Sequence, residues 1–376
     1  MIESILARRA RRAEELAGSR RRAMELVAAL DGLEAARGRL PGSVAQAPGL
    51  AEPIARLREQ CLAVAKEMDR TAERFRRPTL TLGMIGRSGQ GKSRFLQSLT
   101  GLTDDQIPAG KGSFITGVPS HIRHSEHGPG GAEIDFHDER SFVEQVLERY
   151  YGALGLGPAP ATVDEFARRE LPRPPAESTV DQAAWDHLAR YHAALPAYRD
   201  RLTGPTRTMT VPTGQLRRWV VQADEAGHPL HDFRAVRQVR ISTPFGRPDL
   251  GRVSLIDLPG LGDTNLGDVE LLRRALGSEV DVAVFLRRPD THRYGVEEAD
   301  VRLYEEARAA LPEIPLERWS FMLVNRMADG TNEHGVQGFR DSLAGSRIKV
   351  VDVIEVDCTD PAAVRAAFDT LLGRLV

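Results

Sequence analysis

The sequence is poor in cysteine and in long apolar runs. Cys61 and Cys358 are the only cysteines among 376 residues, and a pair so far apart gives neither a disulfide framework nor a paired metal-ligand spacing. No apolar run approaches the roughly eighteen residues that span a bilayer. Residues 1–29 are rich in arginine and lack the uninterrupted apolar core of a secretory signal. We therefore expect a folded protein of the cytoplasm, with peripheral membrane contact as the alternative.

An excess of charge of either sign is also missing. The 51 Lys and Arg residues nearly balance the 53 Asp and Glu residues, which leaves a formal net charge of −2. Such a chain has no overall field that attracts polyanions, so nucleic acid is not an expected partner. Hydrophobic residues make up 41% of the chain, enough for the core of one large domain or two ordinary ones.

Two helices are predicted before residue 78. Residues 2–40 and 53–75 have helical patterns, separated by a stretch that contains Pro and Gly. We expect a hairpin whose apolar stripes pack on each other and on the next domain. Binding of a stripe to a membrane or a partner is the alternative. In the second helix the stripe consists of Ile54, Leu57, Cys61, Val64, Met68 and Phe75.

From residue 78 onward, strands and helices alternate. Helices such as 296–311 and 361–375 lie among apolar strands predicted at residues 80–85, 253–256, 280–286, 320–324 and 350–356. This order predicts the α/β fold class, with a mostly parallel central sheet flanked by helices. Residues 125–247 fit the rhythm poorly and are interpreted as a helical insertion. The predicted parts are an N-terminal helical segment, residues 1–77, and an α/β domain, residues 78–376.

A glycine-rich loop follows the first predicted strand. Residues 86–93, Gly-Arg-Ser-Gly-Gln-Gly-Lys-Ser, have the P-loop spacing, and a helix is predicted to begin near Lys92. In this arrangement backbone N–H groups surround phosphates at a helix N-terminus. Lys92 places a positive charge between the β- and γ-phosphates, and the Ser93 hydroxyl is a ligand for Mg²⁺.

A second motif, Asp-Leu-Pro-Gly at residues 257–260, ends another apolar strand. Asp257 is predicted to hold Mg²⁺ through a water, and the Gly260 N–H is predicted to sense the γ-phosphate.

Arg287 and Arg288 follow a later strand. An exposed turn is expected there, with phosphate contact as the alternative.

A third motif indicates the base. Residues 325–329, Asn-Arg-Met-Ala-Asp, follow an apolar strand and are close to the Asn-Lys-x-Asp element that recognises guanine. Arg326 stands in place of Lys, and Asp329 comes one residue late. A carboxylate still suits guanine, because guanine presents two adjacent N–H donors and adenine does not. Asp357-Cys358-Thr359 lies where a backbone contact to the base is expected.

Together these motifs resemble the dynamin superfamily of large GTPases, especially its bacterial members, over roughly residues 78–376 apart from the insertion. Residues 107–119, Ile-Pro-Ala-Gly-Lys-Gly-Ser-Phe-Ile-Thr-Gly-Val-Pro, are similar to the dynamin stretch that carries a switch threonine. Residues 257–265 are similar to the second switch. The resemblance implies that Thr116 binds Mg²⁺ and orders the first switch. It also implies coupling of hydrolysis to dimerisation of the GTPase domain.

Two features depart from related enzymes. Leu261 stands where Ras-like enzymes place a water-orienting Gln, and Ser88 stands where dynamins place a Gln in the phosphate loop. Gln90 and Arg87 are the nearby polar candidates for that role, with Arg87 as an arginine finger in cis or across a dimer. Dynamins also continue into a helical stalk, whereas this sequence ends with the helix 361–375. We expect either a truncated chain or a protein that works without a stalk.

The sequence thus predicts an enzyme that binds GTP with Mg²⁺ and hydrolyses it to GDP and phosphate. Coupling to homodimerisation through the GTPase domain, or to partner binding, is expected. The alternatives are a nucleotide-sensing binding module with negligible turnover and a P-loop ATPase. Predicted metal ligands are Ser93, Thr116 and Asp257, and predicted catalytic residues are Ser88, Lys92, Thr116 and Gly260. Predicted nucleotide-binding residues are Gly86, Arg87, Ser88, Gly89, Gln90, Gly91, Lys92, Ser93, Arg94, Asn325, Arg326 and Asp329.

Overall fold

The computed structural model describes residues 1–40, 51–107, 118–126, 131–172, 179–223, 228–258, 266–290 and 294–375. Within them the chain divides into two compact units, residues 1–80 and 81–375. Among the residues described, no helix is both long enough and apolar enough to cross a membrane.

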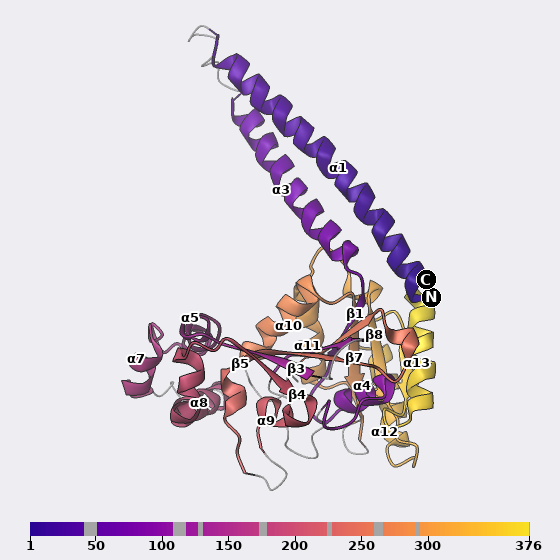
Figure 1. The fold of residues 1–376 in the computed structure, drawn as a ribbon. Coiled ribbons are helices and arrows are strands. Elements are labelled where there is room, and N and C mark those ends of the chain that lie inside the picture. The colour runs from indigo at the N-terminus through magenta and orange to yellow at the C-terminus, as the bar shows by residue number, and fades with distance from the viewer. Residues whose placement is uncertain are drawn as a thin grey trace. The chain divides into compact units, whose positions relative to one another are not determined.

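The first unit is the predicted hairpin, formed by α1 (Ile2–Arg37) and α3 (Ala51–Arg76) lying side by side (Figure 1). Ion pairs join the two helices, from Arg20 Nε to Asp69 Oδ2 at 2.5 Å and from Arg58 Nε to Asp31 Oδ1 at 2.6 Å. The predicted stripe of α3 is only partly buried: Leu57 and Val64 are 42% and 49% exposed, and its other four residues are half-buried. The residues buried in the hairpin helices are Ile5, Ala13, Val27 and Leu30 of α1 and Ala65 and Ala72 of α3.

The second unit is built on a nine-stranded mixed sheet of order β4-β3-β5-β2-β6-β1-β7-β8-β9. Parallel pairing joins β1 to β7, β7 to β8 and β8 to β9, which makes this half of the sheet parallel. β2 is parallel to β5 but antiparallel to β6, and β3 is antiparallel to both β4 and β5. The strands are β1 (Leu80–Ile85), β2 (Ser120–His124), β3 (Gly131–Phe136), β4 (Thr208–Pro212), β5 (Val236–Thr243), β6 (Val253–Asp257), β7 (Val282–Arg287), β8 (Ser320–Asn325) and β9 (Val353–Val356).

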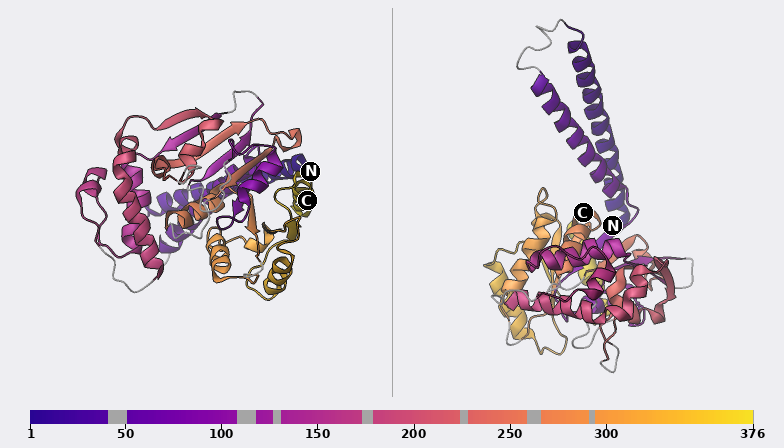
Figure 2. Two further views of the ribbon diagram at one scale, coloured as in Figure 1. Left: turned by 90° about the horizontal axis from the view of Figure 1, so that it is seen from below. Right: turned by 90° about the vertical axis from the view of Figure 1, so that its left-hand side faces the viewer.

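Helices flank the sheet, as Figure 2 shows. Every residue of β1, β7 and β8 is buried, as expected for strands covered on both faces. α10, α11 and α12 share one apolar cluster with these strands, in which Leu276, Ala307 and Phe339 are fully buried. α4 and α13 pack together outside that cluster. The helices are α4 (Lys92–Thr100), α10 (Leu266–Ser278), α11 (Glu298–Ala309), α12 (Glu333–Ala344) and α13 (Pro361–Leu375). The predicted fold class is confirmed.

Residues 125–247 differ from the expected helical insertion because they also contribute β3, β4 and β5 to the sheet. Charged residues interrupt the apolar pattern of these strands in the sequence, but in the structure they form ion pairs between neighbouring strands. Arg240 Nη1 of β5 lies 2.6 Å from Asp135 Oδ2 of β3, and Arg240 also contacts Glu133. Between β3 and β4, aromatic contacts join Phe142 to Tyr198 and Phe166. The α-helices among the described residues of this stretch are α5 (Glu139–Phe142), α6 (Glu148–Ala153), α7 (Val163–Arg168), α8 (Thr179–Thr203) and α9 (Arg217–Val220).

Candidate functional site

The glycine-rich loop connects β1 to α4, and its shape depends on two glycines. A Cβ on Gly86 would lie 2.5 Å from the carbonyl oxygen of Leu286. Gly91 has φ 108°, a left-handed conformation that side chains disfavour, and a Cβ there would lie 2.5 Å from Asn325 Nδ2. The close approach of the loop to β7 and β8 therefore requires glycine at both positions.

Two polar side chains at the start of α4 face the loop and the end of β6. Lys92 Nζ donates to the carbonyl oxygens of Gly86 at 2.7 Å and Arg87 at 3.4 Å. Ser93 Oγ donates to Asp257 Oδ2 at 3.3 Å. The structure thus brings together three residues that the sequence assigns to phosphate and Mg²⁺, although Asp257 is far from the loop in the chain.

Asp257 is the most unusual group of the site. It is only 3% exposed, and its Oδ1 has no hydrogen-bond partner among the residues described. Burial raises the pKa of this carboxyl, while the charge of Lys92 and the hydrogen bond from Ser93 oppose the rise. A buried carboxylate oxygen with spare lone pairs, beside a serine hydroxyl, is a donor set of the kind that Mg²⁺ prefers. The residues present therefore fit the metal that the sequence implies.

Two side chains of the loop contact the end of β7 and the start of α11. Arg87 Nη1 donates to Glu297 Oε2 at 2.5 Å, and Arg287 Nη2 donates to Glu297 Oε1 at 2.6 Å. Gln90 Oε1 accepts from Arg287 Nη1 at 3.3 Å and from the Arg288 N–H at 2.6 Å. Arg287 is buried, not exposed in a turn as the sequence predicts. Arg87 and Gln90, the two polar candidates for orienting water, are therefore both engaged with other residues.

The base-side motif is joined to the loop by Asn325. Its Nδ2 donates to the Gln90 carbonyl oxygen at 3.0 Å, and its Oδ1 accepts from the Cys358 N–H at 3.2 Å. Arg326 Nε donates to Glu333 at 2.6 Å. Asn325 is thus a structural link between three segments.

Asp329 is exposed, unlike the buried Asp257. Its Oδ1 accepts from the Thr331 N–H at 3.0 Å and from the Thr331 hydroxyl at 2.7 Å. These two hydrogen bonds lower the pKa of the Asp329 carboxyl, which keeps it ionised near neutral pH. An ionised carboxylate is the form that accepts from N–H donors.

The other predicted residues lie at the margins of the site or outside the described residues. Ser88 lies in the turn between Arg87 and Gly89 and is half-buried. Arg94 is exposed, and its Nη1 donates to Gln97 Oε1 at 2.9 Å. Thr116, Gly260 and Leu261 lie outside the residues that the structure describes.

Sequence reasoning missed Glu297 and the role of Arg287. Glu297 caps α11, with its backbone N–H donating to Asp300 Oδ2 at 3.0 Å. An acidic residue three positions before another, at the start of a helical pattern, is a signal of a helix N-terminus. It does not indicate a partner such as Arg87, which lies more than two hundred residues earlier.

No family model matches the sequence, and no curated protein matches it. Among solved structures, the chain is similar to two chains of an oligomerised bacterial dynamin pair, which is described as providing a mechanism for the long-range sensing and tethering of membranes. Their sequence identities to this chain are 10% and 12%, and their TM-scores are 0.45 and 0.46. The alignments cover 95% and 94% of this chain and 55% of each of the others, so this chain spans about half their length. Function is therefore inferred from the residues of the site itself.

Proposed function

We propose that this protein binds GTP with Mg²⁺ at the loop of residues 86–93 and hydrolyses it to GDP and phosphate. The observation that carries the proposal is the convergence of Lys92, Ser93 and the buried, half-satisfied carboxylate of Asp257. They lie where the glycine-rich loop connects the end of β1 to the start of α4. Ligands of open α/β sheets bind beyond the carboxyl ends of the strands. The glycine-rich loop follows the carboxyl end of β1, and Asp257 is the last residue of β6.

The phosphates are held by the loop and by Lys92. Residues 89–91 lead directly into α4, which begins at Lys92, and the backbone N–H groups at a helix N-terminus carry partial positive charge that favours anions. Lys92 supplies a full positive charge to the β- and γ-phosphates, and Ser93 and Asp257 hold the metal. When bound, Mg²⁺ compensates the negative charge of the phosphates. Catalysis rests on positioning and charge compensation, because attack of water on the γ-phosphate needs no protein nucleophile.

Preference for guanine is assigned to the turn after β8. Asp329, exposed and ionised, accepts from the two adjacent donors of guanine, while Asn325 fixes the turn against the phosphate loop. A carboxylate at this position does not suit adenine. This assignment separates the proposed GTPase from a P-loop ATPase.

The switch elements complete the proposal. Thr116 binds Mg²⁺, and the Gly260 N–H contacts the γ-phosphate, so both change their contacts after hydrolysis. Ser88 is proposed to orient the attacking water. The change is coupled to homodimerisation through the α/β unit or to binding of a partner, with contact to a membrane surface as the weaker part of the proposal.

A second candidate function is a nucleotide-sensing module with negligible turnover. The contacts of Arg87 with Glu297 and of Gln90 with Arg287 and Arg288 favour it. These contacts engage the two side chains that would otherwise be available to orient water.

The proposal is tested by titrating the protein with GTP and with ATP in the presence of Mg²⁺, and by measuring phosphate release at increasing protein concentration. We expect tighter binding of GTP and a rate per molecule that rises with concentration. Binding of ATP with equal affinity would remove the guanine assignment. No phosphate release at any concentration would leave the sensing module.

The site assignment is tested by Lys92→Ala, which removes the charge that contacts the phosphates. We expect loss of triphosphate binding. Lys349→Ala is the matched control, because it removes the same charge from an exposed position in the same unit. Unchanged affinity of Lys92→Ala would overturn the assignment.

A further inference from the structure

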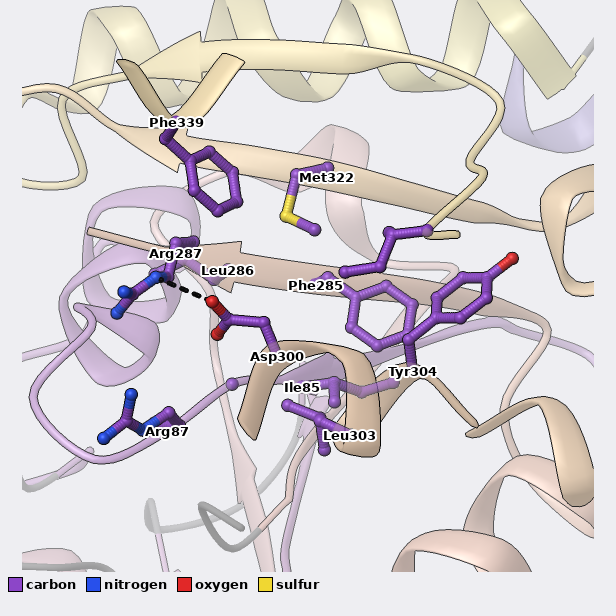
Figure 3. Close-up of a pocket in the computed structure, with 12 residues that line it drawn as sticks. Ile85, Arg87, Phe285, Leu286, Arg287, Asp300, Leu303, Tyr304, Met322 and Phe339 are labelled. Carbon is purple, nitrogen blue, oxygen red and sulfur yellow. Dashed lines mark ion pairs between the residues drawn. The ribbon is translucent and has the colours of Figure 1, made fainter. Parts of the chain in front are cut away.

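A buried arginine stands behind the phosphate loop. Arg287 ends β7, and its side chain is 7% exposed. Its guanidinium donates to two acceptors, Glu297 Oε1 at 2.6 Å and Gln90 Oε1 at 3.3 Å. Nε has no hydrogen-bond partner among the described residues, but it forms an ion pair with Asp300 Oδ2 at 3.3 Å. Figure 3 shows the pair with Asp300 and the side chain of Arg87 nearby. Burying a guanidinium is favourable only with such partners.

The cavity that the described residues form beside Arg287 is too small for an organic ligand. The cavity beside it has a volume of about 20 Å³, which is space for one or two water molecules. Most of its walls are apolar, and include Phe285, Met322 and Phe339. Protein groups therefore surround the charge of Arg287, and the function of Arg287 depends on what those groups do.

One of those groups belongs to the loop itself. Gln90 directly precedes Gly91 and Lys92, and it is held at both its side chain and its backbone. Its Oε1 accepts from Arg287 and from the Arg288 N–H, while its carbonyl oxygen accepts from Asn325 Nδ2. These contacts fix the peptide groups that lead into the first turn of α4.

The other two groups belong to α11. Glu297 caps the helix and binds both Arg287 and Arg87, and Asp300 completes the capping box. Although burial opposes it, the hydrogen bonds and charges of the two arginines hold the pKa of Glu297 below its ordinary value. The carboxylate is thus ionised near neutral pH, and the start of α11 is a fixed anchor for Arg287.

We propose that Arg287 is a positioning residue of the phosphate loop. Anchored on Glu297 and Asp300, it holds Gln90 so that the N–H groups of residues 89–93 are set for the phosphates before a nucleotide arrives. Its planar fork meets Glu297 and Gln90 at once, which a lysine ammonium on a flexible stem cannot reproduce. This inference rests on the proposed function, because it assigns a role in the same nucleotide site.

The test is a double-mutant cycle of Arg287→Lys and Gln90→Ala, read as affinity for GTP with Mg²⁺. A hydrogen bond to a charged group corresponds to about a tenfold change or more, so we expect each single variant to bind about tenfold more weakly. Because Arg287 acts through Gln90, the double variant is expected to be about tenfold weaker, not about a hundredfold. A purely structural role of Arg287 would not produce this coupling.

Arg273→Lys is the matched control. Arg273 of α10 forms an Arg–Glu pair at 2.5 Å with Glu306 of α11, and it has no contact to the loop among the described residues. We expect it to bind GTP as the wild type does. If Arg287→Lys does not fold, Glu297→Gln replaces it in the cycle.

Two outcomes would overturn the inference while the proposed function stands: wild-type affinity in Arg287→Lys or in Gln90→Ala, or effects that multiply in the double variant. A wild-type protein that binds no GTP would instead refute the proposed function. The two failures are therefore distinguishable.

Discussion

Replacing Asp257 by Asn should stabilise the protein while removing its response to Mg²⁺. The carboxylate is buried, and its Oδ1 has no partner among the described residues. Burial raises its pKa, which means that the folded environment disfavours the ionised form despite the attraction of Lys92. An Asn amide has nearly the same shape and no charge. Its carbonyl oxygen still accepts from Ser93.

The magnitude follows from the charge of the buried carboxylate, because the Asn Nδ2 would lack a partner just as Oδ1 does. An unpartnered buried group costs about 1–3 kcal/mol when neutral and more when charged, so we expect the free energy of unfolding of Asp257→Asn to rise by only about 1 kcal/mol. For a domain of this size, that gain corresponds to a rise of roughly 2 °C in melting temperature.

The effect depends on pH with a definite sign. Because the folded-state pKa of Asp257 is raised, the folded protein holds the carboxyl proton more tightly than the unfolded chain does. The stability this provides is fully present below the ordinary pKa of 3.8 and is lost as the pH rises through the folded-state pKa. The advantage of Asp257→Asn is therefore largest above the raised pKa and shrinks as the pH falls toward 3.8.

Thermal unfolding with and without nucleotide measures both effects. At a nucleotide concentration a hundred times the dissociation constant, binding stabilises the wild type by about 2.7 kcal/mol. We expect the part of this gain that requires Mg²⁺ to vanish in Asp257→Asn. A variant that is less stable than the wild type without nucleotide, and keeps the response to Mg²⁺, would refute the reasoning.

Three further predictions concern other parts of the second unit. Gly91→Ala should destabilise the protein by more than Gly89→Ala, measured by denaturant unfolding. Both positions have positive φ, at a cost of roughly 1–2 kcal/mol, but only the new Cβ at Gly91 collides with Asn325; equal losses would contradict this. Burial and the charge of Arg237 lower the pKa of His137 to about 3. Stability should then fall as the pH drops from 6.5 toward 3, by up to about 1.4 kcal/mol per pH unit, and His137→Gln should flatten the pH profile. Asp329→Asn should shift nucleotide preference from guanine toward xanthine in competition titrations, because an amide donates to a carbonyl; an unchanged preference would show that another residue recognises the base.

The proximity of Lys92, Ser93 and Asp257 could be predicted because its signals are local. The loop, Lys92 and Ser93 lie within eight consecutive residues, and an apolar strand before them sets the context. Asp257 is distant in the chain, but it ends a strand with its own recognisable motif. In both cases short-range pattern and chemistry agree.

The support of the loop could not be predicted, because it depends on contacts between distant segments. Arg287 looks like an exposed residue after a strand, and only the fold brings it beside Gln90 and Glu297. The same applies to β3, where Glu133 and Asp135 disrupt the apolar pattern of a strand until Arg240 of β5 pairs with them.

The hairpin shows a different limit. Periodicity correctly indicated two helices, but the predicted stripe of α3 is half-buried at four positions and exposed at two, while Ala65 and Ala72 are buried. Periodicity identifies an apolar face without identifying its partner. Small side chains let two helices approach closely, so alanine can form the contact while larger residues beside it stay exposed.

The amide of Asn325 has a thermodynamic consequence for recognition. One side chain accepts from the backbone that follows β9 and donates to the backbone of the phosphate loop. The proposed phosphate and base subsites are therefore linked through one side chain. Free guanosine and free inorganic triphosphate should each bind far more weakly than their shares of the intact nucleotide suggest, since each fragment loses its own translational and rotational freedom, a cost that the intact nucleotide meets only once. The preference for one base over another is therefore expected to depend on the conformation of the phosphate loop as well as on the turn after β8.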